Sequence, residues 1–531
     1  MSIEHLAAKR SSRIVTVASA VMVVVILGLG AAFSGEASSA LGTMLESTLF
    51  GLKWYYVALV AFVLPFVVWL GVGRYRNVRL GGDEETPEFT WASWFSMLFA
   101  AGMGIGLIFW SVSEPLSHFR ENPFVEHGQT PPAAAMALRL TFFHWGLHAW
   151  AVYALVGLSL AYFAFRRGLP LTIRSLLTPL FGRHADGALG HVADVFAVVS
   201  TAFGVATSLG LGIRQMTAGL GLAAGIETSE TMQLVILAAV VLVATSSAVS
   251  GVRRGVRVLS NLNMLMSVVL LAFFLTFGPT RHILSSLIQA SGDYFQNLIA
   301  LSTWLDVTRH SDWQETWTVF YWAWWIAWSP FVGMFIARIS RGRTIREFVM
   351  GVLLVPAIFT FVWLAVTGGT ALYLELFEGG GLLQVLERDP SLPLFAAVKQ
   401  LAPGVLGTAM IVLIVALSAI YFITSCDSGT LVITTILSLG AEEPPMAQRI
   451  AWGLAEGIIA GVLLTAGGLA ALQSATIAAA LPFSLVLIVI VIGLVRGLRQ
   501  EAVAPREGIR TRSDCEPWTG CYPDRRADRE E

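Results

Sequence analysis

Tryptophans crowd one short apolar segment of this sequence, between residues 317 and 331. Trp324, Trp325 and Trp328 follow the i, i+1, i+4 spacing that places side chains on one face of a helix. Indole faces attract a cation whose charge is spread over methyl groups, with roughly 0.5–2 kcal/mol per ring. The pattern therefore indicates a cage for a methylated ammonium group, and the alternative is ordinary aromatic packing. The segment 134–165 offers partners of the same kind: Trp145, Trp150 and Tyr153.

Glycines alternate in the segment 92–113, at Gly102, Gly104 and Gly106. Gly102 and Gly106 form a GxxxG pair, a pattern that allows close packing of membrane helices. Alternating glycines also weaken a helix, by about 1 kcal/mol each relative to alanine. An unwound stretch inside a membrane would free backbone groups that can hold an ion or a substrate. Both interpretations are open at the level of the sequence.

Small hydroxyl side chains gather around a carboxylate in the segment 404–438, at Thr424, Ser425, Asp427 and Ser428. Polar groups are costly inside a membrane unless they serve a function, and oxygen ligands suit small hard cations. The pattern therefore favours an ion site. The alternative is that the hydroxyls bond back to their own helix while Asp427 lies near the cytoplasmic boundary.

Two histidines, His144 and His148, stand four residues apart, which is a spacing that would suit a metal ion on a helix. No third ligand and no HExxH glutamate accompanies them, so we expect packed histidines or histidines that line a gate. The sequence shows no nucleophile with a base and an orienting group. We therefore do not expect an enzyme.

The elements that must position these side chains are membrane helices. Of the 531 residues, 56% are apolar and only 13% are charged, whereas a soluble protein carries about a quarter charged residues. The net charge is −1 and no basic arm is present, so nothing indicates a nucleic-acid partner. Cys426, Cys515 and Cys521 form neither a metal motif nor a disulfide framework.

Twelve stretches are long and apolar enough to cross a bilayer, which takes about 20 helical residues. Because backbone groups cannot remain unpaired in lipid, they predict an all-α membrane protein. The first stretch follows basic residues and could be a signal peptide, but its length and the lack of a cleavage site favour a span. The predicted spans are 14–34, 52–72, 92–113, 134–165, 189–220, 232–250, 262–279, 313–339, 347–374, 404–438, 449–466 and 469–498.

Basic residues alternate from loop to loop. Arginines concentrate at 74–79, 166–183, 253–257 and 338–346, while the loops between these are poor in Lys and Arg. The positive-inside rule then predicts an even number of spans with both termini in the cytoplasm. The amphipathic segment 282–312 is expected to lie along the outer surface. The charged segment 499–531 is expected to be a poorly ordered cytoplasmic tail.

Together these segments resemble the betaine/carnitine/choline transporter family. The match is close at 97–106 (MLFAAGMGIG), 143–145 (FHW), 320–331 and 338–344 (RISRGRT), and it extends from about residue 10 to residue 498. The resemblance implies a transporter domain over 1–498 with a leucine-transporter-like fold: two extra helices in 1–91, then inverted five-helix repeats at 92–280 and 313–498, with the surface helix at 281–312 between them. It also implies a homotrimer in lipid, in the inner (plasma) membrane of a bacterium.

The resemblance further implies where a substrate and ions would bind. A second sodium site of some members falls on Thr201 and Phe331, but Val205 replaces its other threonine and removes an oxygen ligand. The family's aromatic box falls on Trp145, Trp150, Tyr153, Trp324, Trp325 and Trp328. Its main sodium site falls on the carbonyls of Ala100, Met103 and Tyr421 and the hydroxyls of Thr424 and Ser425.

Position 106 bears on the choice of substrate. Some proton-coupled choline carriers of the family have an aspartate there, whereas this chain has Gly106, which favours a zwitterion such as glycine betaine, with its carboxylate near the backbone of Gly104 and Gly106. Val205 and the stretch 424–429 instead resemble the proton-coupled choline branch. The leading hypothesis is sodium-coupled uptake of glycine betaine, without any bound cofactor. Proton-coupled choline uptake or carnitine-type exchange is the runner-up, and a receptor or osmosensor without net transport is a third hypothesis.

Overall fold

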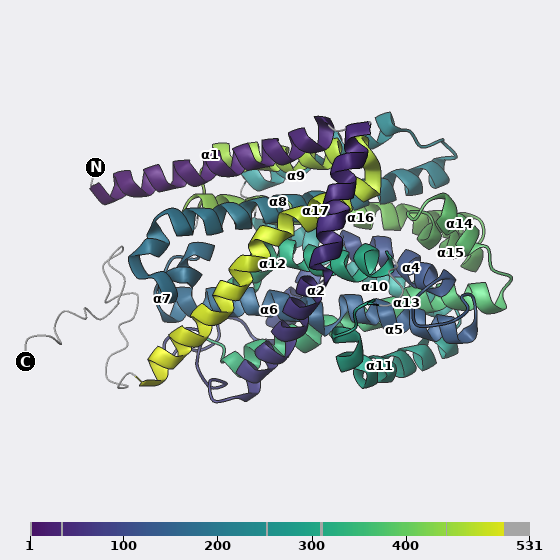
Figure 1. Ribbon diagram of the computed structural model, residues 1–531. Helices are drawn as coiled ribbons and strands as arrows, with labels where there is room; N and C mark the ends of the chain where they lie inside the picture. The colour runs from purple at the N-terminus through teal and green to yellow at the C-terminus, as the bar shows by residue number, and fades with distance from the viewer. Residues whose placement is uncertain are drawn as a thin grey trace, which may run out of the picture.

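The computed structural model is a bundle of helices, described over residues 3–32, 36–102, 104–250, 253–307, 312–441 and 443–503 (Figure 1). Within these ranges, ten helices are long and apolar enough to cross a membrane. The elements are α1 (Ile3–Ala32), α2 (Glu36–Val72), α3 (Trp91–Gly102), α4 (Ile105–Arg120), α5 (Pro131–Trp145), α6 (Leu147–Ala161), η1 (Tyr162–Arg166), η2 (Ile173–Leu177), α7 (Thr178–Phe181), η3 (Gly182–Asp186), α8 (Ala188–Ala224), α9 (Glu230–Ser250), α10 (Arg253–Phe277), α11 (Thr280–Ser302), η4 (Glu315–Val319), α12 (Phe320–Ile339), α13 (Ile345–Phe377), α14 (Leu382–Arg388), α15 (Pro393–Leu401), α16 (Val405–Leu437) and α17 (Met446–Val503).

The difference between these ten helices and the twelve predicted spans has two sources. The predicted span 92–113 is divided between the short helices α3 and α4. The predicted spans 449–466 and 469–498 both lie in α17, which contains non-helical backbone at Gly467 and Gly468. Gly468 has a φ of 59°, a conformation that costs glycine little and other residues considerably more. The end of the first predicted span, at 33–34, lies outside the described residues.

The beginning of α1 and the end of α17 lie at the same end of the bundle, on the left of Figure 1, whereas α14 and α15 lie at the opposite end. The last turns of α17 are held there by Glu501, which accepts hydrogen bonds from Tyr162 and Arg166. The helix therefore continues to Val503, four residues beyond the predicted start of the tail at 499, and the rest of the predicted tail lies outside the described residues.

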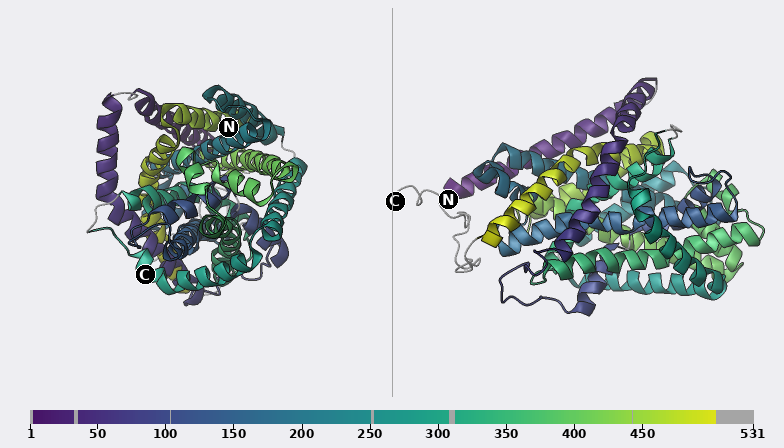
Figure 2. Two further views of the ribbon diagram at one scale, coloured as in Figure 1. Left: turned by 90° about the vertical axis from the view of Figure 1, so that its right-hand side faces the viewer. Right: turned by 60° about the horizontal axis from the view of Figure 1, so that its bottom comes forward.

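Helix α12, which carries the tryptophan run, lies in the interior of the bundle. It packs against α6, α8 and α17, and nearly all of its side chains are buried. The end-on view in Figure 2 shows further helices surrounding this centre, with α1 and α2 at the periphery. Since α12 is covered on all sides, its aromatic residues face protein rather than lipid.

Helix α11 occupies most of the segment predicted to be a surface helix. It packs against α5 and α13 through one face, on which Ile283 and Tyr294 are buried. Ile288 and Ile299 on its other face are 76% and 82% exposed. The helix therefore lies on the outside of the bundle, as its place at the lower edge of Figure 1 also shows.

Two loops that are far apart in sequence pair through their backbones next to the end of α12. Leu80 donates its N–H to Arg343 O at 2.8 Å, and Gly342 donates to Leu80 O at 2.8 Å. Thr344 then begins α13 with a capping box, in which its hydroxyl accepts from Glu347 N and its own N–H is bonded by the Glu347 carboxylate. The loop after α12 is thus fixed to the loop that precedes α3.

Candidate functional site

Two stretches of the first half of the chain that reach α12, α3–α4 and α5–α6, are each interrupted at a glycine. Gly104 separates α3 from α4 and has extended backbone, with φ −150° and ψ 176°. Gly146 separates α5 from α6, and a side chain there would lie 2.5 Å from Phe142 O. At this break Leu107 N and Ile108 N donate to Gly104 O, at 3.1 and 3.4 Å, and the N–H groups before them have no carbonyl of their own helix to bond. The structure shows the helix interruption that one of the two sequence interpretations of the alternating glycines requires.

A cavity lies between these helix ends and α12. The stacked pair Trp324 and Trp325 forms one wall, with ring centroids 5.1 Å apart and planes inclined by 10°. Trp145 stands edge-on to Trp325 at 5.0 Å and 68°. All eight side chains or backbone positions proposed from the sequence for substrate binding line this cavity: Gly104, Gly106, Trp145, Trp150, Tyr153, Trp324, Trp325 and Trp328, together with Leu107, Ala149, Ser208 and Thr360.

Hydrogen bonds from the indole N–H groups fix the orientation of two of these rings. Trp325 Nε1 donates to His144 O at 2.9 Å, and Trp328 Nε1 donates to Gly204 O at 2.8 Å. Both bonds connect α12 to helices of the first half of the chain, α5 and α8. The rings are therefore held in place without a ligand, which reduces the entropy that binding would cost.

Gly106 allows the backbone of α4 to approach the tryptophans. A Cβ atom at this position would lie 2.4 Å from Trp324 Cη2 and 3.2 Å from Trp145 Cη2. At Gly104 the nearest atom, Trp328 Cη2, would be 3.9 Å away, which is an ordinary contact. The absence of a side chain at 106 is therefore a requirement of the packing as well as a feature of the cavity.

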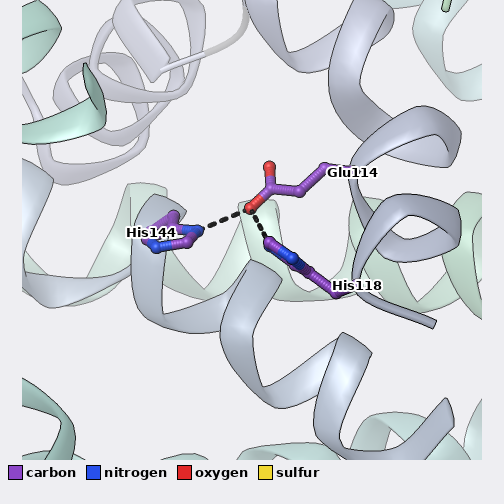
Figure 3. Close-up of side chains that lie close together, drawn as sticks. All are labelled: Glu114, His118 and His144. Carbon is purple, nitrogen blue, oxygen red and sulfur yellow. Dashed lines mark hydrogen bonds and ion pairs between the residues drawn. The ribbon is translucent and has the colours of Figure 1, made fainter. Parts of the chain in front are cut away.

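A carboxyl group that the sequence did not single out lies directly behind the cavity. Glu114 is fully buried, and its Oε2 accepts hydrogen bonds from Trp145 Nε1 at 2.7 Å and from the Tyr321 hydroxyl. Its Oε1 lies 2.7 Å from His144 Nδ1 and 3.3 Å from His118 Nε2 (Figure 3). A lone glutamate four residues before a histidine in a membrane segment was the signal that could have identified it.

The two histidines that the sequence paired have different surroundings. His144 Nε2 lies 3.1 Å from Thr318 Oγ1, and His148 Nε2 lies 2.8 Å from Ser302 Oγ. The hydrogen bonds of His144 to Glu114 and Thr318 are those of a packed histidine. Ligand atoms of Glu114, His118 and His144, which the sequence did not group, all lie within 4.8 Å of one another. His148 does not belong to this group, so the i, i+4 pair is not itself a ligand set.

Three of the residues proposed for the main sodium site lie on one helix. Tyr421, Thr424 and Ser425 lie on α16, and Ala100 lies near the end of α3, while Met103 lies outside the described residues. Thr424 Oγ1 donates to Ile420 O at 2.9 Å, which is the bond back to its own helix that the sequence allowed as an alternative. Its lone pairs can still bind a cation.

At the second proposed sodium site, the hydroxyl of Thr201 lacks a hydrogen-bond partner among the described residues, and its neighbours are apolar. Thr201 Oγ1 is buried and has no hydrogen-bond partner among the described residues. Phe331 is buried on α12, which packs against α8, the helix of Thr201 and Val205. The methyl groups of Val205 point towards Gly429 on α16.

This chain is similar to a known family and to several known proteins. A model of the BCCT family, described as betaine/carnitine/choline family transporter, matches residues 14–503. An uncharacterized transporter of Mycobacterium bovis is 44% identical over 90% of this chain and 80% of its own. The glycine betaine transporter OpuD of Bacillus subtilis is 43% identical over 84% of this chain and 87% of its own. The osmo-dependent choline transporter BetT2 of Acinetobacter baylyi is 39% identical over 93% of this chain and 72% of its own.

Among solved structures, a substrate-bound, outward-open Na⁺-coupled sialic acid symporter is similar to this chain at 14% identity. The alignment covers 78% of this chain and 80% of that one, with a TM-score of 0.42. This score is too low to support a conclusion about the fold or the ion.

Proposed function

The chain belongs to the betaine/carnitine/choline transporter family and is a multi-pass membrane transporter rather than an enzyme, and we propose that it imports glycine betaine or a close analogue. The observation that carries this proposal is the cavity lined by Trp145, Trp324, Trp325 and Trp328. Trimethylammonium cannot donate a hydrogen bond, and a wall of indole faces is the environment that attracts it most strongly.

The backbone at Gly104 and Gly106 suits the other end of a betaine. Both residues line the cavity at the N-terminus of α4. The free N–H groups and the positive end of the helix dipole there favour a carboxylate. A zwitterion of about this length would place its methyl groups among the indoles and its carboxylate at the helix end.

Choline with proton coupling is the second candidate, and one observation favours it. Glu114 brings a buried carboxyl group to within one indole ring of the cavity, through Trp145. The absence of an aspartate at position 106 therefore does not leave the site without an acid. A negative charge on Glu114 would attract choline, which has no carboxylate of its own.

For the architecture, we propose twelve crossings with a leucine-transporter-like arrangement of the two repeats. The interruptions at Gly104 and in α17 support this count, since they account for the two predicted spans that are not separate long helices. The common end of α1 and α17 supports an even count with both termini in the cytoplasm. We further propose a homotrimer in the inner membrane, with alternating access driven by sodium bound at Thr424 and Ser425.

Uptake into proteoliposomes tests the cargo and the ion separately. Labelled betaine, choline and carnitine are compared with a sodium gradient, with potassium in place of sodium, and with a protonophore. We expect betaine accumulation that depends on sodium. Choline accumulation that the protonophore abolishes would select the second candidate, and no flux of any of the three would refute both.

Two tryptophans of α12 provide a matched pair of variants for the cage. Trp324 and Trp322 are each 1% exposed, but only Trp324 lines the cavity, whereas Trp322 stacks on His148. We expect Trp324→Phe to raise the KM for betaine by roughly 2- to 30-fold, which corresponds to about 0.5–2 kcal/mol. Trp322→Phe should leave the KM unchanged. Equal effects of the two replacements would show that general packing, not a cage, determines affinity.

A further inference from the structure

A second fully buried carboxyl group lies away from the aromatic cavity, in the first half of α17. Glu456 Oε2 accepts hydrogen bonds from Cys426 Sγ and Thr430 Oγ1, each at 3.2 Å. Its Oε1 is buried and has no partner among the described residues. A Cβ placed on Gly429 would lie 3.2 Å from this Oε1 and 3.0 Å from Val205 Cγ2, so the orphaned oxygen lies over Gly429, next to the valine.

Among the described residues, no charged group forms an ion pair with Glu456. The charged neighbour on α16 is Asp427, which is also acidic. The Arg449 guanidinium of α17 interacts electrostatically with Asp427. α8 contributes Val205, and α9 contributes Val241 and Thr245 beside Gly457 and Gly453 of the same α17 turns. A thiol and a hydroxyl are weak donors, and an ionised carboxylate held only by them in an apolar site would cost several kcal/mol. The geometry therefore suits the neutral acid.

The position of Glu456 connects it to the aromatic cavity through one turn of α8. The side chain of Val205 lies beside Gly429, on the side that also faces Glu456 Oε1. Val205 directly follows Gly204 in the chain. Gly204 O accepts the hydrogen bond from Trp328 Nε1, and a Cβ on Gly204 would be 2.8 Å from Trp328 Cδ1. This turn of α8 is thus in contact with a cage tryptophan on one side and lies near the buried acid on the other. Movement of α8 against α16 and α17 would alter both environments.

We propose that Glu456 is a proton-binding site of the transport cycle. In the packed arrangement seen here the group carries its proton. When the helices separate and water reaches the site, the O–H bond breaks, the proton passes to water, and the remaining carboxylate is hydrated. Reprotonation from water on the other side restores the packed arrangement. The inference rests on the proposed transport function, and it assigns a proton to the region where Val205 replaces an oxygen ligand for a second sodium ion.

Replacement by glutamine tests this role, because Glu456→Gln keeps the shape of the side chain but cannot lose a proton. Purified full-length protein is reconstituted into vesicles that contain a fluorescent pH indicator, and uptake of betaine and choline is measured at a fixed sodium gradient, with and without an added pH gradient. For the wild type we expect substrate-dependent proton entry with accumulation. For Glu456→Gln we expect proton entry to be lost and the added pH gradient to give no further accumulation of substrate, with exchange of labelled for unlabelled substrate retained. The control is Glu375→Gln, which should behave as the wild type; the Glu375 carboxylate, near the end of α13, accepts a hydrogen bond from Leu383 N at the start of α14.

Failure of the inference can be distinguished from failure of the proposed function. If the wild type shows no exchange of any quaternary-ammonium substrate, the proposed function itself fails. If the wild type accumulates substrate without any movement of protons, the role of Glu456 is overturned, whatever the variant does. It is equally overturned if Glu456→Gln retains proton-driven accumulation, or if Asp427→Asn alone abolishes it.

Discussion

Trp145 donates its indole N–H to the carboxyl group of Glu114 at 2.7 Å, so that a wall of the aromatic cavity is also the donor to a buried acid. The same oxygen accepts from the Tyr321 hydroxyl, and Tyr321 belongs to the helix that supplies the stacked tryptophans. The acid therefore joins α4, α5 and α12 at one point. It orients the ring of Trp145, and in its ionised form it would bring a negative potential towards the cavity.

Replacement of Glu114 by glutamine should weaken binding more for choline than for betaine. The amide has no charge to attract an ammonium group and can accept from fewer of the donors that Glu114 satisfies. Loss of a hydrogen bond to a charged group costs about 1.5–3 kcal/mol, so we expect the KM for choline to rise about 10-fold or more. The measurement is initial-rate uptake of both substrates, with Glu126→Gln, an exposed site, as the control. An equal change for both substrates would argue against an electrostatic role.

Replacement by alanine should be tolerated at one of the two cavity glycines and should be harmful at the other. At Gly106 the added methyl group would lie 2.4 Å from Trp324 Cη2, whereas at Gly104 its nearest neighbour is 3.9 Å away. Overpacking of this kind costs about 1–3 kcal/mol. We therefore expect Gly106→Ala to lower both betaine affinity and the melting temperature in detergent, and Gly104→Ala to lower neither on steric grounds. Tolerance of alanine at 106 would mean that Trp324 can move aside.

Two threonines of α16 with the same local hydrogen bonding distinguish an ion ligand from a structural hydroxyl. Thr424 and Thr434 each bond back to the carbonyl four residues earlier, at 2.9 and 2.7 Å. If Thr424 also binds sodium, Thr424→Ala should raise the sodium concentration for half-maximal uptake about 10-fold, or ~1.4 kcal/mol. Thr434→Ala should not. Identical sodium dependence in the two variants would remove Thr424 from the ion site.

The capping box at the start of α13 should contribute to stability rather than to transport specificity. Thr344 and Glu347 satisfy two backbone N–H groups that otherwise lack partners. Loss of such a cap costs about 0.5–2 kcal/mol, so Thr344→Ala should lower the melting temperature of the detergent-solubilised protein while the ratio of betaine to choline uptake is unchanged. Thr408→Ala is the comparison, because its hydroxyl bonds only to Gly404 O within its own helix. A melting temperature equal to that of the wild type would show that the cap is dispensable.

Local pattern predicted the parts of the site that depend on a single helix. The i, i+1, i+4 spacing of Trp324, Trp325 and Trp328 follows from helix geometry alone, and all three line the cavity. The interruption at Gly104 lies within the glycine run for which the sequence left helix packing and helix interruption both open. Whether these residues bind a substrate remains a prediction.

The missed features depend on contacts between segments that are distant in sequence. Glu114 acquires its role from Trp145 and Tyr321, which are 31 and 207 residues away, and no local period encodes such a contact. Glu456 lies in an apolar run that reads as an ordinary span, where the one acidic residue was the available signal. The division of 134–165 at Gly146 was also missed, since a single glycine in an apolar run does not by itself predict a break.

The close approach of Gly106 to Trp324 has a consequence for how such proteins can diverge. An aspartate at position 106 is one amino-acid change away from glycine, but its first carbon atom would already overlap the indole ring. A lineage that acquired the acid would need an earlier or simultaneous rearrangement of the ring, so the change in selectivity would be accessible in only some genetic backgrounds. Position 324 and position 106 should therefore evolve together.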